Sequence, residues 1–563
     1  MESCLLPPGS LARGRWAAGQ SRGAFLALQA WENAKDTFRK HSSKWYNFWV
    51  GGPKQMTQSI IIIGAGIAGL SAGCYGQMNG YATRIFELHD KPGGLCTSWK
   101  RKGYTFDGCI EWTIGSRAGT PVNRIFAELG AVQGRRFIAH DVMQRIEGSD
   151  GRALTIYTNI DQLERHMKEL SPADSAVIEE LCNVGRRWIP FVDLVDPSGL
   201  LEGIKMGFSM MPFLSLLQKY GKITAEAFAA RFSDPFLRQA LMAFGSVNGC
   251  LGIPVAGLMY WPAAAHIRDA GYPIGGSLEF ARAIERRYLD LGGEMHYRSR
   301  VGKILVEADP AGRGDRAVGV RLVDGSEHYA DVVISAADGH ATIFDMLEGR
   351  YASDKVRGYY EKLPIYKSWI QVSLGVARDL SGEAPRVSYW LDEPIDIAGQ
   401  KIGCISFRHY CMDPSMAPPG KSVVVVLFDS DHAYWKPLYK ERERYEAEKK
   451  EIAAKVIDAL ERRLPGISGQ IEEVDVSTPM TVERYTGNWQ GSQEGWLITT
   501  DTIMIMGRGM DKTLPGLTNL YMAGQWVEPG GGVSASALSG WRVVRMLCKK
   551  DRKKFSTSLP TVS

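Results

Sequence analysis

The stretch Ser59-Ile-Ile-Ile-Ile63, followed at once by Gly64-Ala-Gly66-Ile-Ala-Gly69, decides the fold of this chain. An unbroken apolar run of this kind is typical of a parallel strand that is buried on both faces, and the residues after Gly69 have helical character. In a strand–turn–helix unit with this glycine spacing, the first glycine permits a tight turn. The second lets a pyrophosphate approach the backbone, and the third lets the helix pack closely on the strand. The stretch therefore predicts an α/β, Rossmann-like dinucleotide-binding domain.

The residues that follow indicate which dinucleotide is bound. A second predicted strand, 82–87, ends at Glu87, whose carboxylate can accept hydrogen bonds from ribose hydroxyl groups. The free N–H groups at the start of the helix would hold the phosphates. A second glycine-rich loop, Gly93-Gly94-Leu95, comes directly after the acidic strand, where a nicotinamide-binding domain would continue into ordinary βαβ alternation. Backbone amides in such a loop can approach a flavin closely, so the predicted cofactor is FAD.

These motifs resemble those of the phytoene desaturase branch of the FAD-dependent amine oxidase superfamily, which includes carotenoid cis–trans isomerases and retinol saturases. Three later segments carry the same resemblance: Tyr272-Pro-Ile-Gly-Gly276, the strand Ala330–Asp338, and Ala523–Ala537 near the end of the chain. The resemblance spans about 59–548. It implies a two-dinucleotide-binding fold that holds one FAD non-covalently, with the adenine held through the backbone at Val301.

Taken together, the motifs and the resemblance give one set of predicted cofactor-binding residues. They are Gly64, Gly66, Ile67, Ala68, Gly69, Glu87, Gly93, Gly94, Leu95, Val301, Ala336, Gly524, Gln525, Gly532, Val533 and Ser536.

The same resemblance predicts two interleaved domains and two terminal segments. The FAD-binding domain is expected at 56–112, 266–354 and 486–550, the inserted α+β substrate-binding domain at 113–265 and 355–485, a basic and poorly ordered extension at 1–55, and a tail at 551–563. The extension has three interpretations: an upstream addition to a chain that naturally starts at Met56, a basic tail that lies on a membrane surface, or, less favoured, a mitochondrial-type transit peptide.

The predicted substrate domain differs in character between its two parts. The first part is helix-rich by pattern, whereas the second has strand-like runs at 369–375 and 422–428 and a charged helix at 439–463. Within the first part, the apolar stretch 206–217 is too short to span a bilayer and is interrupted by Pro212. Because lysines flank this stretch, it is either a helix that contacts a membrane interface or a buried helix.

Composition excludes several other classes of function. The net charge of +5 is too small over 563 residues to predict nucleic-acid binding. Nine scattered cysteines, none in a CxxC pair, indicate thiols in a reducing compartment. The protein is therefore expected in the cytoplasm, either free in solution or peripheral to a membrane. Structural zinc sites need closely spaced pairs of ligands, and the cysteines form no such pair, so no metal site is predicted.

The predicted chemistry is hydride exchange between flavin N5 and a carbon of a long apolar isoprenoid or carotenoid, giving desaturation, saturation or isomerisation. Glu111 and Glu528 are the candidate catalytic residues, because a buried glutamate beside a flavin can act as an acid. A quinone or oxygen would be the electron acceptor. Two alternatives stay open: an amine or amino-acid oxidase, and a flavin-binding scaffold without turnover. A long apolar tunnel favours the isoprenoid, and a small polar cage favours the amine.

Overall fold

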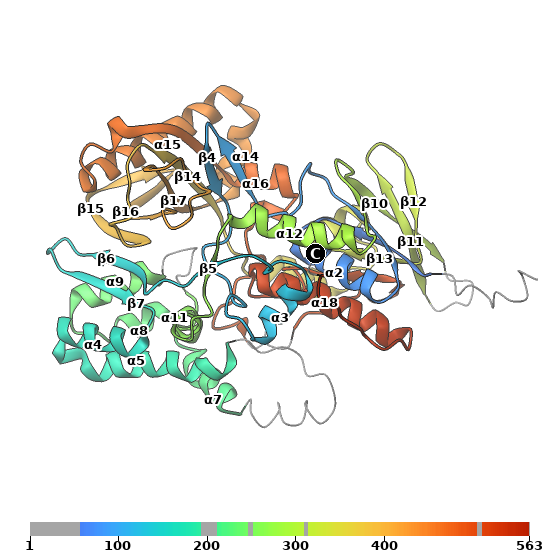
Figure 1. Cartoon of the computed structure of the whole chain (residues 1–563), viewed down its shortest axis with the longest axis horizontal. Coiled ribbons are helices and arrows are strands. Elements are labelled where there is room, and N and C mark those ends of the chain that lie inside the picture. Colours follow the sequence, from blue (N-terminus) through green and yellow to red (C-terminus); the bar gives the residue numbers. More distant parts are fainter. Residues whose placement is uncertain (1–56, 193–210, 246–251, 309–313, 504–508, 562–563) are drawn as a thin grey trace, which may run out of the picture. The chain divides into compact units, whose positions relative to one another are not determined.

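The computed structural model describes residues 57–192, 211–245, 252–308, 314–503 and 509–561. Its central feature is a parallel sheet with the strand order β20-β13-β1-β2-β9 (Figure 1). The strands are β1 (Ser59–Ile63), β2 (Ala82–Phe86), β9 (Glu294–His296), β13 (Val332–Ser335) and β20 (Leu520–Met522). Strand β1 lies in the middle, and its isoleucines are at most 3% exposed, which confirms the predicted buried strand and the α/β fold.

Three helices pack together beside this sheet: α2 (Ile67–Met78), α12 (Gly276–Asp290) and α18 (Gly532–Lys550). Helices α2 and α18 cross very closely, because a Cβ atom on Gly540 would overlap the carbonyl oxygen of Ala68. The Ser71 hydroxyl in α2 donates a hydrogen bond of 2.7 Å to the carbonyl of Ala537 in α18. The last helix of the chain is thereby fixed to the first helix of the dinucleotide-binding unit.

A second, mixed sheet has the order β18-β14-β17-β16-β15-β6-β7. Its strands are β6 (Val142–Glu147), β7 (Ala153–Tyr157), β14 (Ser368–Val376), β15 (Arg386–Ile397), β16 (Gln400–His409), β17 (Ser422–Ser430) and β18 (Ile471–Ser477). Helices α14 (His432–Lys440) and α15 (Arg442–Arg463) lie beside it (Figure 1). The two predicted strands and the charged helix correspond to β14, β17 and α15, whereas the long hairpin β15–β16 and the hairpin β6–β7 were not predicted.

A group of helices lies beside β6 and β7. It comprises α4 (Ile160–Leu170), α5 (Ser175–Trp188), α7 (Met211–Tyr220), α8 (Ala225–Ala229), α9 (Pro235–Gly245), α10 (Val255–Leu258) and α11 (Tyr260–His266). A shared apolar core holds them, with Ile178, Phe228 and Leu237 all fully buried. Within the described ranges, none of the helices combines the length and apolar character that a bilayer span requires.

The strands of the parallel sheet come from 56–112, 266–354 and 486–550, and those of the mixed sheet from 113–265 and 355–485. The predicted extension 1–55 lies outside the described residues. The predicted tail packs on the fold, since Phe555 contacts the rings of Tyr75 and Trp541 and the amide of Ser556 donates to Asn79.

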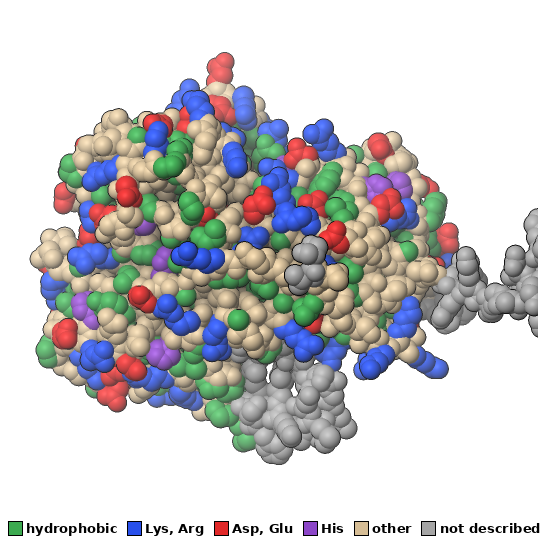
Figure 2. Space-filling view, in the orientation of Figure 1, with side chains coloured by type: hydrophobic (Ala, Val, Ile, Leu, Met, Phe, Trp, Pro, Cys, Tyr) green, Lys and Arg blue, Asp and Glu red, His purple; other side chains and the backbone are tan. Residues whose placement is uncertain are grey.

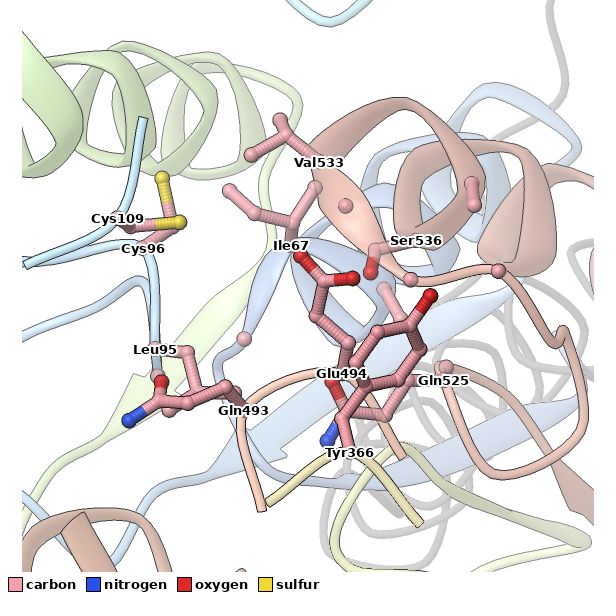
Figure 3. A pocket seen from close by; sticks show the side chains of 18 of the residues that line it. Ile67, Leu95, Cys96, Cys109, Tyr366, Gln493, Glu494, Gln525, Val533 and Ser536 are labelled. Atoms are coloured by element: carbon pink, nitrogen blue, oxygen red, sulfur yellow. The ribbon is translucent and has the colours of Figure 1, made fainter. Parts of the chain in front are cut away.

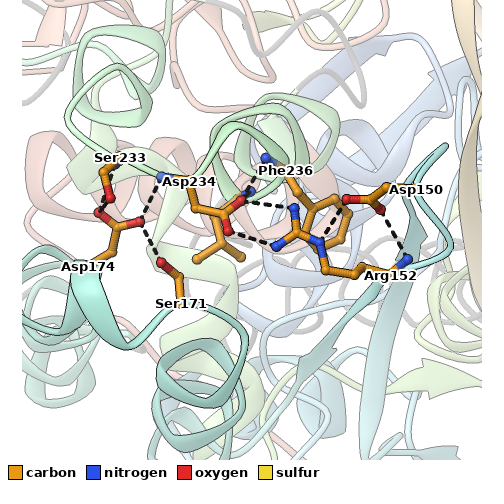
Figure 4. A network of polar contacts seen from close by, with 8 residues as sticks. Asp150, Arg152, Ser171, Asp174, Ser233, Asp234 and Phe236 are labelled. Atoms are coloured by element: carbon orange, nitrogen blue, oxygen red, sulfur yellow. Dashed lines mark hydrogen bonds and ion pairs between the residues drawn. The ribbon is translucent and has the colours of Figure 1, made fainter.

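A hydrogen-bond network that includes three aspartates links segments of the helical group (Figure 4). The carboxylate of Asp174, at the start of α5, accepts hydrogen bonds from the amide of Ser233 at 2.7 Å, the amide of Asp234 at 3.0 Å and the hydroxyl of Ser171 at 2.9 Å. Asp234 in turn accepts from Arg152 at 2.7 Å. Burial acts to raise the pKa of Asp174, but the hydrogen bonds outweigh burial and lower this pKa to about 2.

Replacement of Asp174 by asparagine should lower the free energy of unfolding by about 2 kcal/mol at neutral pH, because charged hydrogen bonds are lost. The carboxylate stabilises the fold fully above its unfolded pKa of about 3.9, and this contribution is lost as the pH falls through about 2. Denaturant unfolding measures the free energy of unfolding at pH 7 and at lower pH. The difference in this free energy between wild type and Asp174→Asn should become smaller as the pH falls. Asp150→Asn, at the exposed end of the same network, is the matched control and should change stability little.

Candidate functional site

A cavity of about 1270 Å³ extends from the glycine turn after β1 to the helices α5, α7 and α11. Figure 3 shows the part of it near Ile67 and Val533. Its two ends differ in character. One end is formed by glycines and backbone at the ends of β1, β2, β13 and β20, and the other by large aromatic and aliphatic side chains. The two ends therefore suit two different kinds of ligand.

The three glycines after β1 each have a distinct geometry. Gly64 has a φ of +95°, a conformation that favours glycine, and this turns the chain from the strand into α2. A Cβ atom on Gly66 would meet nothing within 4 Å, and Gly66 lines the cavity. A Cβ atom on Gly69 would overlap the carbonyl oxygen of Gly64. The turn, the open space for a ligand and the close packing of helix on strand thus match the roles predicted for these glycines.

The second glycine loop lies directly against the first. Gly93 and Gly94 both have positive φ values of +109° and +59°, and the amide of Gly93 donates a 2.9 Å hydrogen bond to the carbonyl of Ala65. A Cβ atom on Gly94 would lie 3.4 Å from the Cα atom of Gly66. The two loops together give the cavity a wall without side chains, and such a wall fits the close approach of a pyrophosphate.

Glu87 lies at the end of β2 and lines this part of the cavity. Its carboxylate accepts hydrogen bonds from the amide of Ala65 at 2.6 Å and from the amide of His89 at 2.8 Å. Burial raises its pKa, and the backbone donors act in the opposite direction. Glu87 therefore holds the glycine turn in place, and its contact with a ribose stays a prediction.

The C-terminal motif forms the opposite wall. Gly530, Gly531 and Gly532 all have positive φ values, of +102°, +63° and +82°, and bring the chain into α18 with the start of the helix at the cavity. The amide of Gly524 donates a 2.9 Å hydrogen bond to the hydroxyl of Ser539 in α18. The free N–H groups at such a helix start would stabilise negative charge on a bound cofactor.

The predicted cofactor-binding residues thus come together at one end of a single cavity. Those that line it are Gly64, Gly66, Ile67, Ala68, Glu87, Gly93, Gly94, Leu95, Val301, Ala336, Gly524, Gln525, Gly532, Val533 and Ser536. Gly69 lies outside the lining, behind the turn, where it packs against Gly64. These residues fit FAD, because glycines leave space on both walls and two helix starts face that space. No described cluster of histidine, cysteine or carboxylate residues could hold a metal ion.

The two candidate catalytic glutamates are placed differently. Glu111 lines the cavity, and its carboxylate forms ion pairs with the buried guanidinium groups of Arg386 and, at 3.2 Å, Arg408. Glu528 lies outside the cavity lining. Its carboxylate forms an ion pair with Arg542 and, at 2.9 Å, with Lys512. The position and partners of Glu528 therefore favour a structural role.

Glu494 was not predicted, although it lies on the cavity surface (Figure 3). A Cβ atom on Gly531 would be 2.6 Å from the Cβ atom of Glu494, so Glu494 lies beside the start of α18. Burial raises the pKa of Glu494 to about 7. Its neighbour Gln493 is 8% exposed and also lines the cavity. The local sequence around Glu494 contains no recognisable motif, so only the fold places it here.

The other end of the cavity is aromatic. The rings of Trp112 and Trp261 are stacked with centroids 5.4 Å apart, and Phe244 stacks on Trp261 at 5.8 Å. Farther along, Phe213 of α7 contacts Trp188 of α5 with centroids 5.0 Å apart. All five side chains line the cavity. Flat and apolar walls of this kind suit a long hydrocarbon.

Two substitutions three residues apart would separate cofactor binding from folding. Gly66→Val should abolish FAD retention in a chain that still folds, because the new side chain fills the open space beside the turn. Gly69→Val should instead destabilise the fold by about 3 kcal/mol, because the side chain overlaps backbone. Flavin absorbance per chain and the denaturant midpoint measure the two effects. A Gly66→Val protein with the FAD content of the wild type would contradict the assignment.

Known proteins resemble this chain in sequence and in fold. The prolycopene isomerase of Arabidopsis thaliana is 27% identical over 85% of this chain and 81% of its own length. A lycopene-forming phytoene desaturase from Paracoccus sp. is 26% identical over 84% of this chain and 94% of its own length. Among solved structures, cyclohexylamine oxidase from Brevibacterium oxydans has a TM-score of 0.54 at 14% identity, with 88% of this chain and all of that chain covered. This structural likeness shows the fold alone.

The sequence of residues 67–548 matches a family described as flavin containing amine oxidoreductase. The match covers most of the chain. It begins at Ile67, directly after Gly66, and includes the second glycine loop, the aromatic end of the cavity and the start of α18. The protein is an FAD-dependent oxidoreductase that belongs to the flavin containing amine oxidoreductase family.

Proposed function

We propose that this protein acts on the carbon–carbon double bonds of a long apolar isoprenoid of the carotenoid class. The observation that carries the proposal is the aromatic end of the cavity, which is continuous with the end that fits FAD. The curated relatives support it, because their names are those of prolycopene isomerases and phytoene desaturases. A cavity of about 1270 Å³ exceeds the usual ligand pocket, as expected where a dinucleotide and a long lipid bind together.

The apolar lining disfavours a small amine as the substrate. A cationic amine would require a compact cage with an anionic or polar wall, whereas rings form the wall around Trp188, Phe213 and Phe244. Glu111, a carboxylate close to this end, is already paired with Arg386 and Arg408. The likeness to cyclohexylamine oxidase concerns the fold, so it does not bear on this choice.

Glu494 supplies the proton chemistry in this proposal. FAD, when bound, would accept or return the electron pair of the carbon–carbon bond. The protein has to take up or release the matching proton, and a carboxyl group with a pKa of about 7 can do either near neutral pH. Glu111 is less suited, because the guanidinium groups of Arg386 and Arg408 already engage its carboxylate. We assign Glu111 the role of positioning the loop that carries Trp112.

Helix α7 supports peripheral contact with a membrane. Met211 and Leu214 are 64% and 47% exposed, whereas Phe213 and Leu217 of the same helix line the cavity. Figure 2 shows hydrophobic side chains at the lower edge of this face, where Figure 1 places α7. Elsewhere on the visible face, basic and acidic side chains are interspersed (Figure 2). The outer face of α7 thus combines these apolar side chains with the exposed polar residues Ser215, Gln218 and Lys219. A helix with such an outer face can lie in the interface while its other face borders the substrate cavity.

The expected location in the cytoplasm, at the membrane surface, stays a prediction. So does the electron acceptor, for which a quinone or oxygen is proposed. A quinone would reach the cavity by the same apolar route as the substrate, whereas oxygen needs no defined route.

Incubation of the FAD-loaded protein with phytoene and with a cis-lycopene in liposomes tests the substrate class. Chromatography should show a carotenoid with more or fewer double bonds, or an altered isomer. Unchanged carotenoids, together with anaerobic bleaching of the flavin by a primary amine, would contradict the proposal in favour of amine oxidation.

Glu494→Gln should lower the rate of this conversion by about 100-fold or more at unchanged FAD content. A step in which the Glu494 carboxylate accepts the proton should accelerate as the pH rises through about 7, and a step in which it donates should slow over the same range. This pH dependence of the rate should be absent in Glu494→Gln and present again in Glu494→Asp. A pH profile that is the same in wild type and Glu494→Gln would exclude Glu494 as the proton-exchanging group.

The double variant Met211→Glu/Leu214→Glu should weaken binding to anionic liposomes by at least about tenfold, because two apolar side chains leave the interface. Leu289→Glu is the matched control, since Leu289 is 46% exposed on the distant helix α12. Co-sedimentation measures both. Equal binding of the wild type and the α7 variant would place the membrane contact elsewhere or remove it.

A further inference from the structure

Two cysteines face each other at the base of a hairpin beside the cavity. Strands β3 (Ser98–Arg101) and β4 (Tyr104–Asp107) are antiparallel, with Ser98 opposite Asp107. Continued outward by two residues on each side, this register places Cys96 opposite Cys109. The amide of Gly108 donates a 3.0 Å hydrogen bond to the carbonyl of Thr97, so the pairing does extend beyond the strands.

The geometry of this pair fits a disulfide. Figure 3 shows the sulfur atoms of Cys96 and Cys109 side by side, and their thiols interact with each other. Directly opposed residues of an antiparallel pair have Cα atoms about 4.5–5.5 Å apart, within the range that a disulfide spans. The bond can therefore form without a rearrangement of the two loops.

Both cysteines line the cavity that fits FAD. Cys96 follows the loop Gly93-Gly94-Leu95, and Cys109 precedes Glu111 and Trp112 in the chain. Cys96 is buried, and burial raises its pKa well above the usual value, with a smaller contribution from Cys109. A thiol of this kind carries little thiolate at neutral pH and reacts slowly with oxidants from solvent. Any oxidant of this thiol would therefore have to act from the cavity, which both cysteines line.

We propose that Cys96 and Cys109 are a redox-active pair that closes to a disulfide and exchanges two electrons with the flavin of the same cavity. On closure, two S–H bonds break and one S–S bond forms, and the two electrons and two protons released pass to the oxidised flavin. The reverse step takes two electrons and two protons from the reduced flavin and restores both thiols. The proposal rests on FAD binding by this cavity and is independent of the substrate class.

The pair would link the redox state to the shape of the cavity wall. A closed disulfide joins the loop that follows Gly94 to the segment that carries Glu111, across the base of the β3–β4 hairpin. The open pair leaves these two cavity walls connected through the hairpin and through hydrogen bonds to Ser277, which accepts from the Cys96 thiol at 3.3 Å and from the amide of Ile110 at 2.7 Å.

Anaerobic photoreduction of the FAD-loaded protein with EDTA and light tests the proposal, because the flavin absorbs the light. Samples taken before and after illumination are quenched in acid, alkylated and mapped by mass spectrometry. The expected result is a Cys96–Cys109 disulfide in the air-oxidised protein and two alkylated thiols after illumination. Reductive titration with dithionite should consume about four electrons per FAD in the wild type and about two in Cys109→Ser.

Cys404→Ser is the matched control, because Cys404 is also partly buried but lies outside the cavity lining; it should titrate like the wild type. Two free thiols in the air-oxidised holoprotein would overturn the proposal. A disulfide that dithiothreitol opens but flavin photoreduction does not would also overturn it, because the bond would then be isolated from the flavin. Neither experiment uses an isoprenoid, so failure here is distinct from failure of the proposed function.

Discussion

The close contact between the start of α2 and the end of β1 is the constraint on which the rest of the structure depends. Any side chain at Gly69 would overlap the carbonyl of Gly64, so the helix can leave the strand at this angle only with glycine there. The same tight exit lets Gly540 of α18 pack against the carbonyl of Ala68. Because α18 begins at the cavity, a contact between backbone atoms at one end of the chain positions the wall built by the other end.

That constraint also explains the division of the cavity into two unlike ends. Where backbones meet closely, as at Gly66 and Gly94, there are no side chains to fill the space, and the wall consists of peptide groups and helix starts. Where the helices α5, α7 and α11 meet, large rings separate the backbones and form the wall instead. A ligand that presents phosphates suits the first end, and a hydrocarbon suits the second.

Features encoded in short stretches were predictable from the sequence, and features created by distant contacts were not. The glycine turns could be predicted from the local sequence, because only glycine tolerates the φ of Gly64 or the crowding at Gly69. The place of β6 in the mixed sheet escaped prediction because its pairing with β15 joins segments more than two hundred residues apart. Glu494 likewise has no motif in its local sequence; the fold places it beside Gly531 at the start of α18, and burial there raises its pKa. Glu528 illustrates the converse error: proximity to a motif in sequence suggested a cavity position, whereas its side chain turns to Lys512 and Arg542.

Helix α7 presents apolar side chains both to the outside and to the cavity, and this has a kinetic consequence. With the membrane contact proposed for α7, a hydrocarbon would pass from the lipid phase along Leu214 and Phe213 without dissolving in water, so its aqueous solubility would not limit the reaction. The relevant concentration becomes the mole fraction of substrate among the lipids. Dilution of that substrate with inert lipid would slow turnover even at a constant total amount, whereas addition of buffer would not.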